Sequence, residues 1–138
     1  MSTDISPEIS NRSKWWIPRE RYYELKHFSM QYPEWKKVLA NKLYLNSTSV
    51  VEVNGGQIEF KDPVSGIASE AEYYLKLVEM VEACSEAADM DISRWILKAV
   101  TTGVPYERLR TVYDIPCGRT KFYEAYRKYF WLLDKCRR

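Results

Sequence analysis

Side chains that can donate hydrogen bonds to other molecules gather near residue 119, where a short basic run follows a turn. The run contains Arg119, Thr120 and Lys121, and Tyr123 follows two positions later. An arginine can donate two parallel hydrogen bonds to the edge of a guanine, and lysine or threonine can reach bases or phosphates. Such contacts require these side chains on the first turns of a helix that enters a DNA major groove. We therefore predict Arg119, Thr120, Lys121 and Tyr123 as base contacts.

Further polar side chains before and after this run suit contacts with phosphate. Each phosphate that a protein neutralises releases condensed counterions, so such contacts add affinity that depends on salt. They fix the register of the protein on DNA and do not read its sequence. The predicted phosphate contacts are Arg108, Arg110, Glu124, Arg127 and Lys128. The alternative for each of these side chains, and for the basic run, is a solvated helix face.

Three short helices have to position these residues. Apolar residues at helical spacing predict a first helix over 92–100, which Gly103 ends in a left-handed cap, a second over 106–113 and a third from about 119 toward 135. Three short helices with a basic last one are typical of a helix-turn-helix, and the alternative is an ordinary three-helix bundle. The inward stripe of the third helix is predicted to be Phe122, Tyr126, Tyr129 or Phe130, and Leu133.

The upstream chain is also predicted to be mainly helical, so the expected fold class is mainly α: a helical bundle with a C-terminal helix-turn-helix. The expected elements are helices over 19–31 and 34–45 separated by Tyr32 and Pro33, a polar loop over 46–49, a small β-hairpin near 50–60, a turn over 62–66 and a helix over 67–88. The predicted domains are a helical hairpin with a loop or small β-hairpin (1–62) and a helical domain (63–138) that ends in the helix-turn-helix (about 91–135).

The net charge of +2 conceals an uneven distribution of charge along the chain. Residues 52–91 carry two basic and ten acidic side chains, a net charge of −8, whereas residues 104–138 carry nine basic and four acidic side chains, a net charge of +5. A basic segment attracts the phosphate backbone and an acidic one repels it. We therefore expect the acidic middle to face away from DNA or to contact another protomer or RNA polymerase.

Nothing in the sequence predicts catalysis, so we expect no enzyme, no catalytic residue, no metal site and no cofactor. His27 is the single histidine and lacks companion ligands at metal-binding spacing. The phosphate-binding, dinucleotide-binding and nucleophile-elbow motifs are also missing. Cys84, Cys117 and Cys136 form no CxxC pair, so we interpret them as reduced thiols. Cys117 has a second interpretation as a redox sensor, but a role in the turn is favoured.

Composition predicts a folded protein outside the membrane. Hydrophobic residues make up 46% of the chain and aromatic residues 14%, which suits one compact domain or two small subdomains. No stretch approaches the ~18 apolar residues of a membrane span, and residues 1–13 lack the features of a signal peptide. We expect a cytoplasmic location and no membrane partner. The five tryptophans are predicted to pack in the core rather than to stack on bases.

A resemblance to a known family rests on three C-terminal segments and several upstream residues. The C-terminal segments are 99–109, 114–123 and 126–133, and the upstream residues are Ile17, Pro18, Arg19, Tyr22, Tyr23, Leu25, Tyr32, Pro33, Glu34, Trp35, Lys36, Asp62 and Pro63. The chain resembles small phage and prophage proteins of Gram-positive bacteria. These are similar in their C-terminal half to the fourth region of sigma factors and to RinA-type or ArpU-type phage transcriptional regulators. The turn over 115–122 is longer than the tightest helix-turn-helix spacing.

This resemblance implies a phage-type transcriptional regulator in the bacterial host cell, with double-stranded DNA as its partner. The helix-turn-helix would read the major groove, and the protein would contact RNA polymerase or form a homo-oligomer. One alternative is a small terminase-like subunit that recognises DNA for packaging. Another is a protein-binding inhibitor in which the helix-turn-helix is only a scaffold and the acidic middle is the functional surface.

Overall fold

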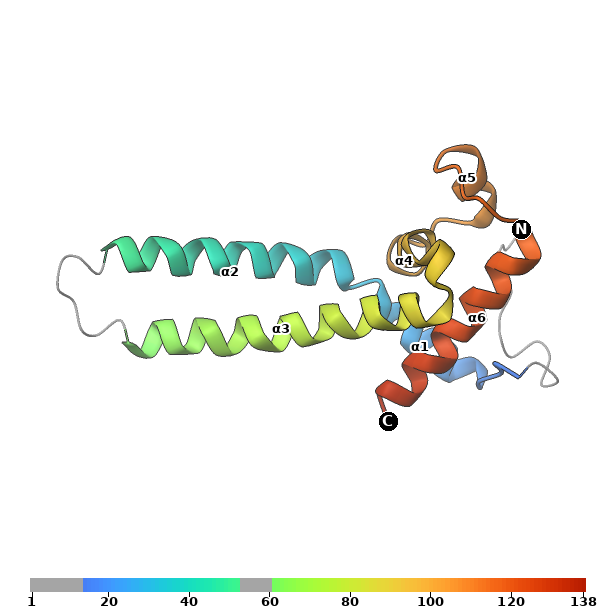
Figure 1. The fold of residues 1–138 in the computed structure, drawn as a ribbon. Helices are drawn as coiled ribbons and strands as arrows, with labels where there is room; N and C mark the ends of the chain where they lie inside the picture. The colour runs from blue at the N-terminus through green and yellow to red at the C-terminus, as the bar shows by residue number, and fades with distance from the viewer. Residues whose placement is uncertain (1–13, 53–60) are drawn as a thin grey trace. The chain divides into compact units, whose positions relative to one another are not determined.

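The computed structural model in Figure 1 describes residues 14–52 and 61–138, and it is mainly helical. The elements are α1 (Arg19–Ser29), α2 (Tyr32–Glu52), α3 (Lys61–Ala88), the short 3-10 helix η4 (Met90–Ile92), α4 (Ser93–Thr102), α5 (Tyr106–Thr111) and α6 (Arg119–Cys136). None of the residues in these two ranges forms a strand. The prediction of a mainly α fold is confirmed.

The chain forms two compact units. The first, which we call the terminal unit, contains residues 14–32 and 80–138 of the described chain, and the hairpin unit contains residues 33–79. In the terminal unit, α1, α4 and α6 pack against one another and α5 packs on α4. All the predicted contact residues therefore belong to a unit that is assembled from both ends of the sequence.

The hairpin unit consists of antiparallel α2 and α3 (Figure 1), which an ion pair between Lys42 and Glu70 connects. The predicted break between the first two helices is present, but it lies at Met30 and Gln31 and not at Tyr32 and Pro33. Pro33 lies in the first turn of α2, where its missing N–H would have no partner within the helix. The loop predicted over 46–49 is likewise helical, because α2 continues to Glu52.

The strand predicted to begin at Val50 is wrong, since Val50 and Val51 are the two residues before the last residue of α2, Glu52. A valine in a helix costs only ~0.5 kcal/mol relative to the best helix formers, so its β-branch does not decide the conformation. The rest of the predicted β-hairpin, residues 53–60, lies outside the described residues. The turn predicted over 62–66 is also wrong, because α3 begins at Lys61 and accommodates Pro63 in its first turn.

Aromatic side chains form much of the core of the terminal unit. The hydroxyl oxygens of Tyr22 in α1 and Tyr126 in α6 are 2.8 Å apart, as are those of Ser29 and Tyr129, so the buried hydroxyls have hydrogen-bond partners. The ring of Phe130 makes edge contacts with Tyr22 and Tyr126, a geometry that aromatic pairs favour. The predicted inward stripe of α6 is confirmed, because Phe122, Tyr126, Tyr129, Phe130 and Leu133 are all buried.

The path from α4 to α5 also follows the sequence prediction. Gly103 adopts the left-handed conformation with φ 77°, and its N–H donates to the carbonyl oxygen of Ala99. A residue with a Cβ is strained in this conformation, which explains why glycine ends the helix here.

The prediction that tryptophans pack in the core holds for Trp35, which is buried, and is wrong for Trp16, which is 38% exposed.

Candidate nucleic-acid interface

Helix α6 has one buried face and one outer face. Its buried residues cover about half of the helical circumference and hold the helix against the core of the terminal unit. The remaining positions share the opposite side of the helix. The outer face consists of Thr120, Lys121, Glu124, Lys128, Trp131 and Lys135, which are exposed or half-buried.

The N-terminal end of α6 borders an open groove beside α5. Gly118 is the N-cap residue and provides no side-chain cap, so no side chain of this residue competes for the first amide groups of the helix. The groove is lined by Gly118 and Arg119 on one side and by Arg110 and Thr111 on the other. The Glu107 carboxylate also lines the groove, so two arginines and a helix N-terminus face one carboxylate. The remaining positive charge favours an anion such as phosphate.

Arg119 points from the first turn of α6 toward α5. Its Nη1 donates to a carboxylate oxygen of Glu107, with which it forms an ion pair. Its guanidinium carbon lies 5.2 Å from the ring centroid of Tyr123 and 6.0 Å from that of Tyr106. The side chain nevertheless remains 46% exposed. The hydrogen bond to Glu107 raises the pKa of Arg119 further, so the guanidinium stays charged.

Lys121 lies on the outer face, one turn before Glu124. Its Nζ is 3.9 Å from a carboxylate oxygen of Asp89 and 3.9 Å from one of Asp91, both near η4. The Lys121 side chain is 49% exposed. Ion pairs of this length at the protein surface contribute at most ~1 kcal/mol, so a phosphate or a base can displace them.

The structure separates the remaining predicted base contacts. Thr120 is exposed in the first turn of α6, beside Lys121. Tyr123 is buried, with only 5% of its surface exposed, and its ring contacts those of Phe122 and Tyr126. An aromatic ring held in the core cannot reach a base edge without unpacking, so we exclude Tyr123 from the candidate interface and keep Thr120.

The predicted phosphate contacts on α5 lie on different sides of that helix. Arg108 and Arg110 are both exposed, but residues two positions apart in a helix point about 200° apart. Arg110 lines the groove beside Arg119, and Arg108 does not. On α6, Arg127 is half-buried and its Nη1 lies 3.5 Å from the carbonyl oxygen of Tyr123, one turn earlier. The structure therefore places Arg110 beside Arg119 at the groove. It does not bring all the predicted phosphate contacts together there.

Trp15 covers the middle of the outer face of α6. Its Nε1 donates to Oε2 of Glu124 at 2.8 Å, and its ring makes an edge contact with Trp131 at 4.9 Å between centroids. The Nζ of Lys128 lies 5.3 Å from the centroid of the same ring. Glu124 and Lys128 are therefore engaged within the terminal unit, whereas Thr120 and Lys121 in the first turn stay exposed.

The turn before α6 is structural. The carbonyl oxygen of Cys117 accepts a hydrogen bond from the hydroxyl of Tyr106, which ties this turn to α5. Burial raises the pKa of the Cys117 thiol, although the nearby Lys121 opposes this effect. A redox-sensing cysteine requires a lowered pKa, so the redox-sensor interpretation of Cys117 is not supported.

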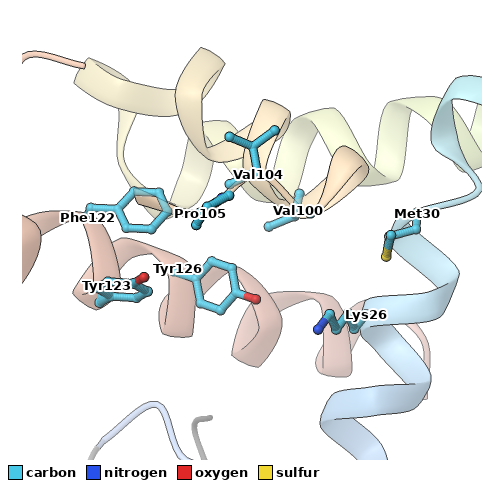
Figure 2. Close-up of a pocket in the computed structure, with 10 residues that line it drawn as sticks. Lys26, Met30, Val100, Val104, Pro105, Phe122, Tyr123 and Tyr126 are labelled. Carbon is cyan, nitrogen blue, oxygen red and sulfur yellow. The ribbon is translucent and has the colours of Figure 1, made fainter. Parts of the chain in front are cut away.

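A small cavity lies between α1, the α4–α5 connection and α6 (Figure 2). Lys26 of α1 and Met30, which follows α1, face it from one side, Val100 of α4 and Pro105 of the connection from another, and Tyr126 from α6. Its volume is about 40 Å³. Sites for drug-sized ligands have volumes of about 300–1,000 Å³, so this cavity suits one or two water molecules and not an organic cofactor.

Sequence reasoning missed three features of the interface: the carboxylate of Glu107, the acidic pair Asp89 and Asp91, and the covering ring of Trp15. Glu107 precedes Arg119 by 12 positions, and Trp15 precedes Glu124 by 109. Periodicity within one element predicts a face of that element, but it does not predict which side chain from another element meets that face. No sequence signal could have identified these partners.

Within residues 14–52 and 61–138 we find no cluster of three or more histidine, cysteine or acidic side chains that could hold a metal ion. No helix in the same ranges has the length and apolar character needed to cross a membrane. Comparisons of the chain with protein-family models, with curated proteins and with solved structures find no match.

Proposed function

We propose that this chain is a sequence-specific transcriptional regulator that binds double-stranded DNA, with α5 and α6 as the helix-turn-helix. The observation that carries this proposal is the position of Arg119, Thr120 and Lys121. All three are exposed on the first turn of α6, while the rest of the helix is fixed to the core through its aromatic face. A helix that reads the major groove needs hydrogen-bonding side chains at this end and a rigid support behind them.

The groove between α5 and α6 supports the same proposal. Arg110 and Arg119 line it together with the N-terminal end of α6. Helix N-termini and arginine side chains are common partners of DNA phosphates, which fix the orientation of a reading helix. We assign Arg110 to a phosphate beside the groove and Arg127 to the flank of the same interface, and we leave out Arg108, which points to the other side of α5.

The hairpin unit is proposed to serve a different partner. Glu70, Glu72 and Glu79 of α3 are exposed, and such an acidic surface repels DNA. We propose that it contacts another protomer or RNA polymerase. The assignment to phage or prophage regulators, which act in the cytoplasm of the host cell, rests on the sequence resemblance.

The test is an in vitro selection of binding sites from randomised duplex DNA. The enriched sequence and a scrambled version are then titrated at several salt concentrations, because phosphate contacts alone give affinity that falls uniformly with salt. A specific regulator should bind the enriched sequence at least ~1,000-fold more tightly than the scrambled one. Absence of any enriched sequence would contradict the proposal.

Charge-reversal variants locate the interface. Arg119→Glu and Lys121→Glu should each abolish specific binding without unfolding the protein, because both side chains are exposed and their ion pairs contribute little to stability. Lys37→Glu is the matched control, since Lys37 is exposed and lies in the hairpin unit. Wild-type affinity in both α6 variants would exclude the first turn of α6 as the reading element.

A further inference from the structure

The orientation of Arg119 is fixed by groups from both α5 and α6. Glu107 accepts a hydrogen bond from Nη1, and the faces of Tyr106 and Tyr123 lie against the guanidinium. Both rings are buried, with 7% and 5% of their surfaces exposed, so the core determines where they lie. An arginine that is half exposed would normally sample many rotamers, whereas these contacts restrict Arg119 to a small set.

The guanidinium of Arg119 has N–H donors that Glu107 does not engage and that can bind another molecule. A guanidinium has five N–H donors, and Glu107 engages Nη1. Nη2 and Nε of Arg119 have no hydrogen-bond acceptor among the residues that the structure describes. A bidentate contact with guanine needs two donors in one plane, and ordering the side chain before binding reduces the entropy lost on binding.

Stability does not explain the pair of Glu107 and Arg119. Their side chains are 57% and 46% exposed, and ion pairs between such exposed groups contribute little to stability. The carboxylate also places a negative charge at the groove where DNA phosphates are expected, which on its own weakens binding to any DNA sequence. The pair is therefore better explained by the orientation that it gives to Arg119.

We propose that Glu107 is a positioning residue, which holds Arg119 in the orientation that donates two hydrogen bonds to a guanine in the DNA site. This inference rests on the proposed function and adds a specificity-determining residue to the same site. Glu107 itself does not touch the DNA. It acts through Arg119, so its positioning role appears in the ratio of the affinities for two sequences, and not in the affinity for either sequence alone.

Glu107 could act as a positioning residue or as a simple negative charge. These two roles predict different affinity ratios when its side chain is removed. If Glu107 only repels phosphate, Glu107→Ala strengthens binding to the enriched and the scrambled DNA by the same factor, and their affinity ratio stays constant. If Glu107 positions Arg119, the same variant strengthens binding to scrambled DNA and lowers the affinity ratio. A merely structural role leaves the ratio unchanged once the fold is shown to be intact.

The experiment measures this affinity ratio for the wild type, Glu107→Ala, Arg119→Ala and the double variant at one salt concentration. Glu79→Ala is the matched control, because Glu79 is an exposed glutamate on α3 in the hairpin unit. Arg119→Ala should lower the ratio by ~10-fold or more, as expected for loss of one bidentate base contact. Glu107→Ala should lower it by ~5-fold, and the double variant should lose no more than Arg119→Ala, because Glu107 acts only through Arg119.

The outcomes separate this inference from the proposed function. If Arg119→Ala lowers the ratio and Glu107→Ala leaves it unchanged, Arg119 reads DNA without positioning by Glu107, and the inference is overturned alone. If selection enriches no sequence, the proposed function fails and the inference with it. A lower ratio in Glu107→Ala and a wild-type ratio in Glu79→Ala, with circular dichroism spectra of both unchanged, would establish the positioning role.

Discussion

The thiol sulfurs of Cys84 and Cys136 lie 3.8 Å apart, although the two residues are separated by 52 positions in the sequence. Cys84 is buried in α3, and Cys136 is exposed at the last residue of α6. Both residues belong to the terminal unit. The contact therefore brings together two thiols of unequal accessibility.

We expect oxidised glutathione to convert this pair into an intramolecular disulfide. Burial, together with the neighbouring Cys136, raises the pKa of Cys84 to about 12, so the exposed Cys136 thiolate attacks the glutathione disulfide first and releases one glutathione. Cys84 then displaces the second glutathione, and the protein loses two hydrogens. Intact-mass measurement and thiol counting follow this change. In the chain-entropy model the new cross-link stabilises the fold by about 4 kcal/mol.

Two serine variants control this prediction. Cys117→Ser should still form the disulfide, whereas Cys136→Ser should not form it. A stable mixed disulfide of glutathione at Cys136 in the wild type would show that the Cys84 sulfur cannot reach its neighbour.

Asp134 should make stability depend on pH. Its Oδ1 accepts a hydrogen bond from Nε of Arg21 at 2.6 Å, and its Oδ2 accepts one from Nη2 of Arg138 at 3.0 Å. Burial alone would raise the pKa of Asp134, but the two arginines outweigh it and lower the pKa below 3.8. Because the pKa is lowered in the folded state, the stabilisation is present above pH 3.8 and is lost as the pH falls through the folded-state pKa.

Asp134→Asn measures this contribution. At neutral pH the variant should lose about 1–3 kcal/mol of unfolding free energy, the value of hydrogen bonds to a charged group. Urea denaturation at pH 7 and at pH 3 should show that the difference from the wild type becomes smaller at the lower pH. Glu79→Gln serves as an exposed control. A difference that stays constant with pH would mean that the charge of Asp134 does not contribute.

Gly103 and Gly118 should respond differently to replacement by alanine. Gly103 has φ 77°, so Gly103→Ala should cost about 1–2 kcal/mol of unfolding free energy through backbone strain. An added Cβ at Gly103 would lie 3.6 Å from Cε of Met30, an ordinary contact, so shortening Met30 should not recover the loss. Thermal denaturation of Gly103→Ala and of the double variant with Met30→Ala tests this reasoning.

Gly118→Ala is the matched variant. Gly118 has φ −83°, and no atom lies within 4 Å of an added Cβ. Alanine is a poorer N-cap residue than glycine, but it restricts the unfolded chain, so the net change should stay within about 0.5 kcal/mol. Equal losses in Gly103→Ala and Gly118→Ala would contradict the role of the left-handed conformation.

Removal of Trp15 should increase the affinity for DNA without changing specificity. Trp15→Ala uncovers the outer face of α6 and releases Lys128 from the tryptophan ring. If Lys128 then neutralises one more phosphate, the affinity for enriched and scrambled DNA should rise several-fold, and the salt dependence should steepen by about 0.9 logarithmic units per decade of salt. Trp16→Ala is the control, because Trp16 is exposed. Weaker binding by Trp15→Ala would instead place Trp15 in the interface.

The sequence by itself determined the features that depend on neighbours along the chain. The buried stripe of α6, from Phe122 to Leu133, follows from the helical repeat, and the end of α4 follows from the freedom of Gly103 to adopt positive φ. These signals are local, because one helix turn or one backbone angle contains all the information. The length of α2 was not determined in this way. Its polar and β-branched last turns have only a weak helix preference, so their sequence did not indicate that the helix continues to Glu52.

Only the tertiary structure decided what each exposed side chain meets. It placed Tyr123 in the core, Glu107 against Arg119, and Trp15 over Glu124. The sequence indicated that the first turn of α6 is basic, but which side chains of α6 are held, covered or accessible depends on residues 12 to 109 positions away. Such contacts arise when separate helices pack together, and the spacing of residues within one helix has no information about its partner, because packing depends on the shapes of both surfaces.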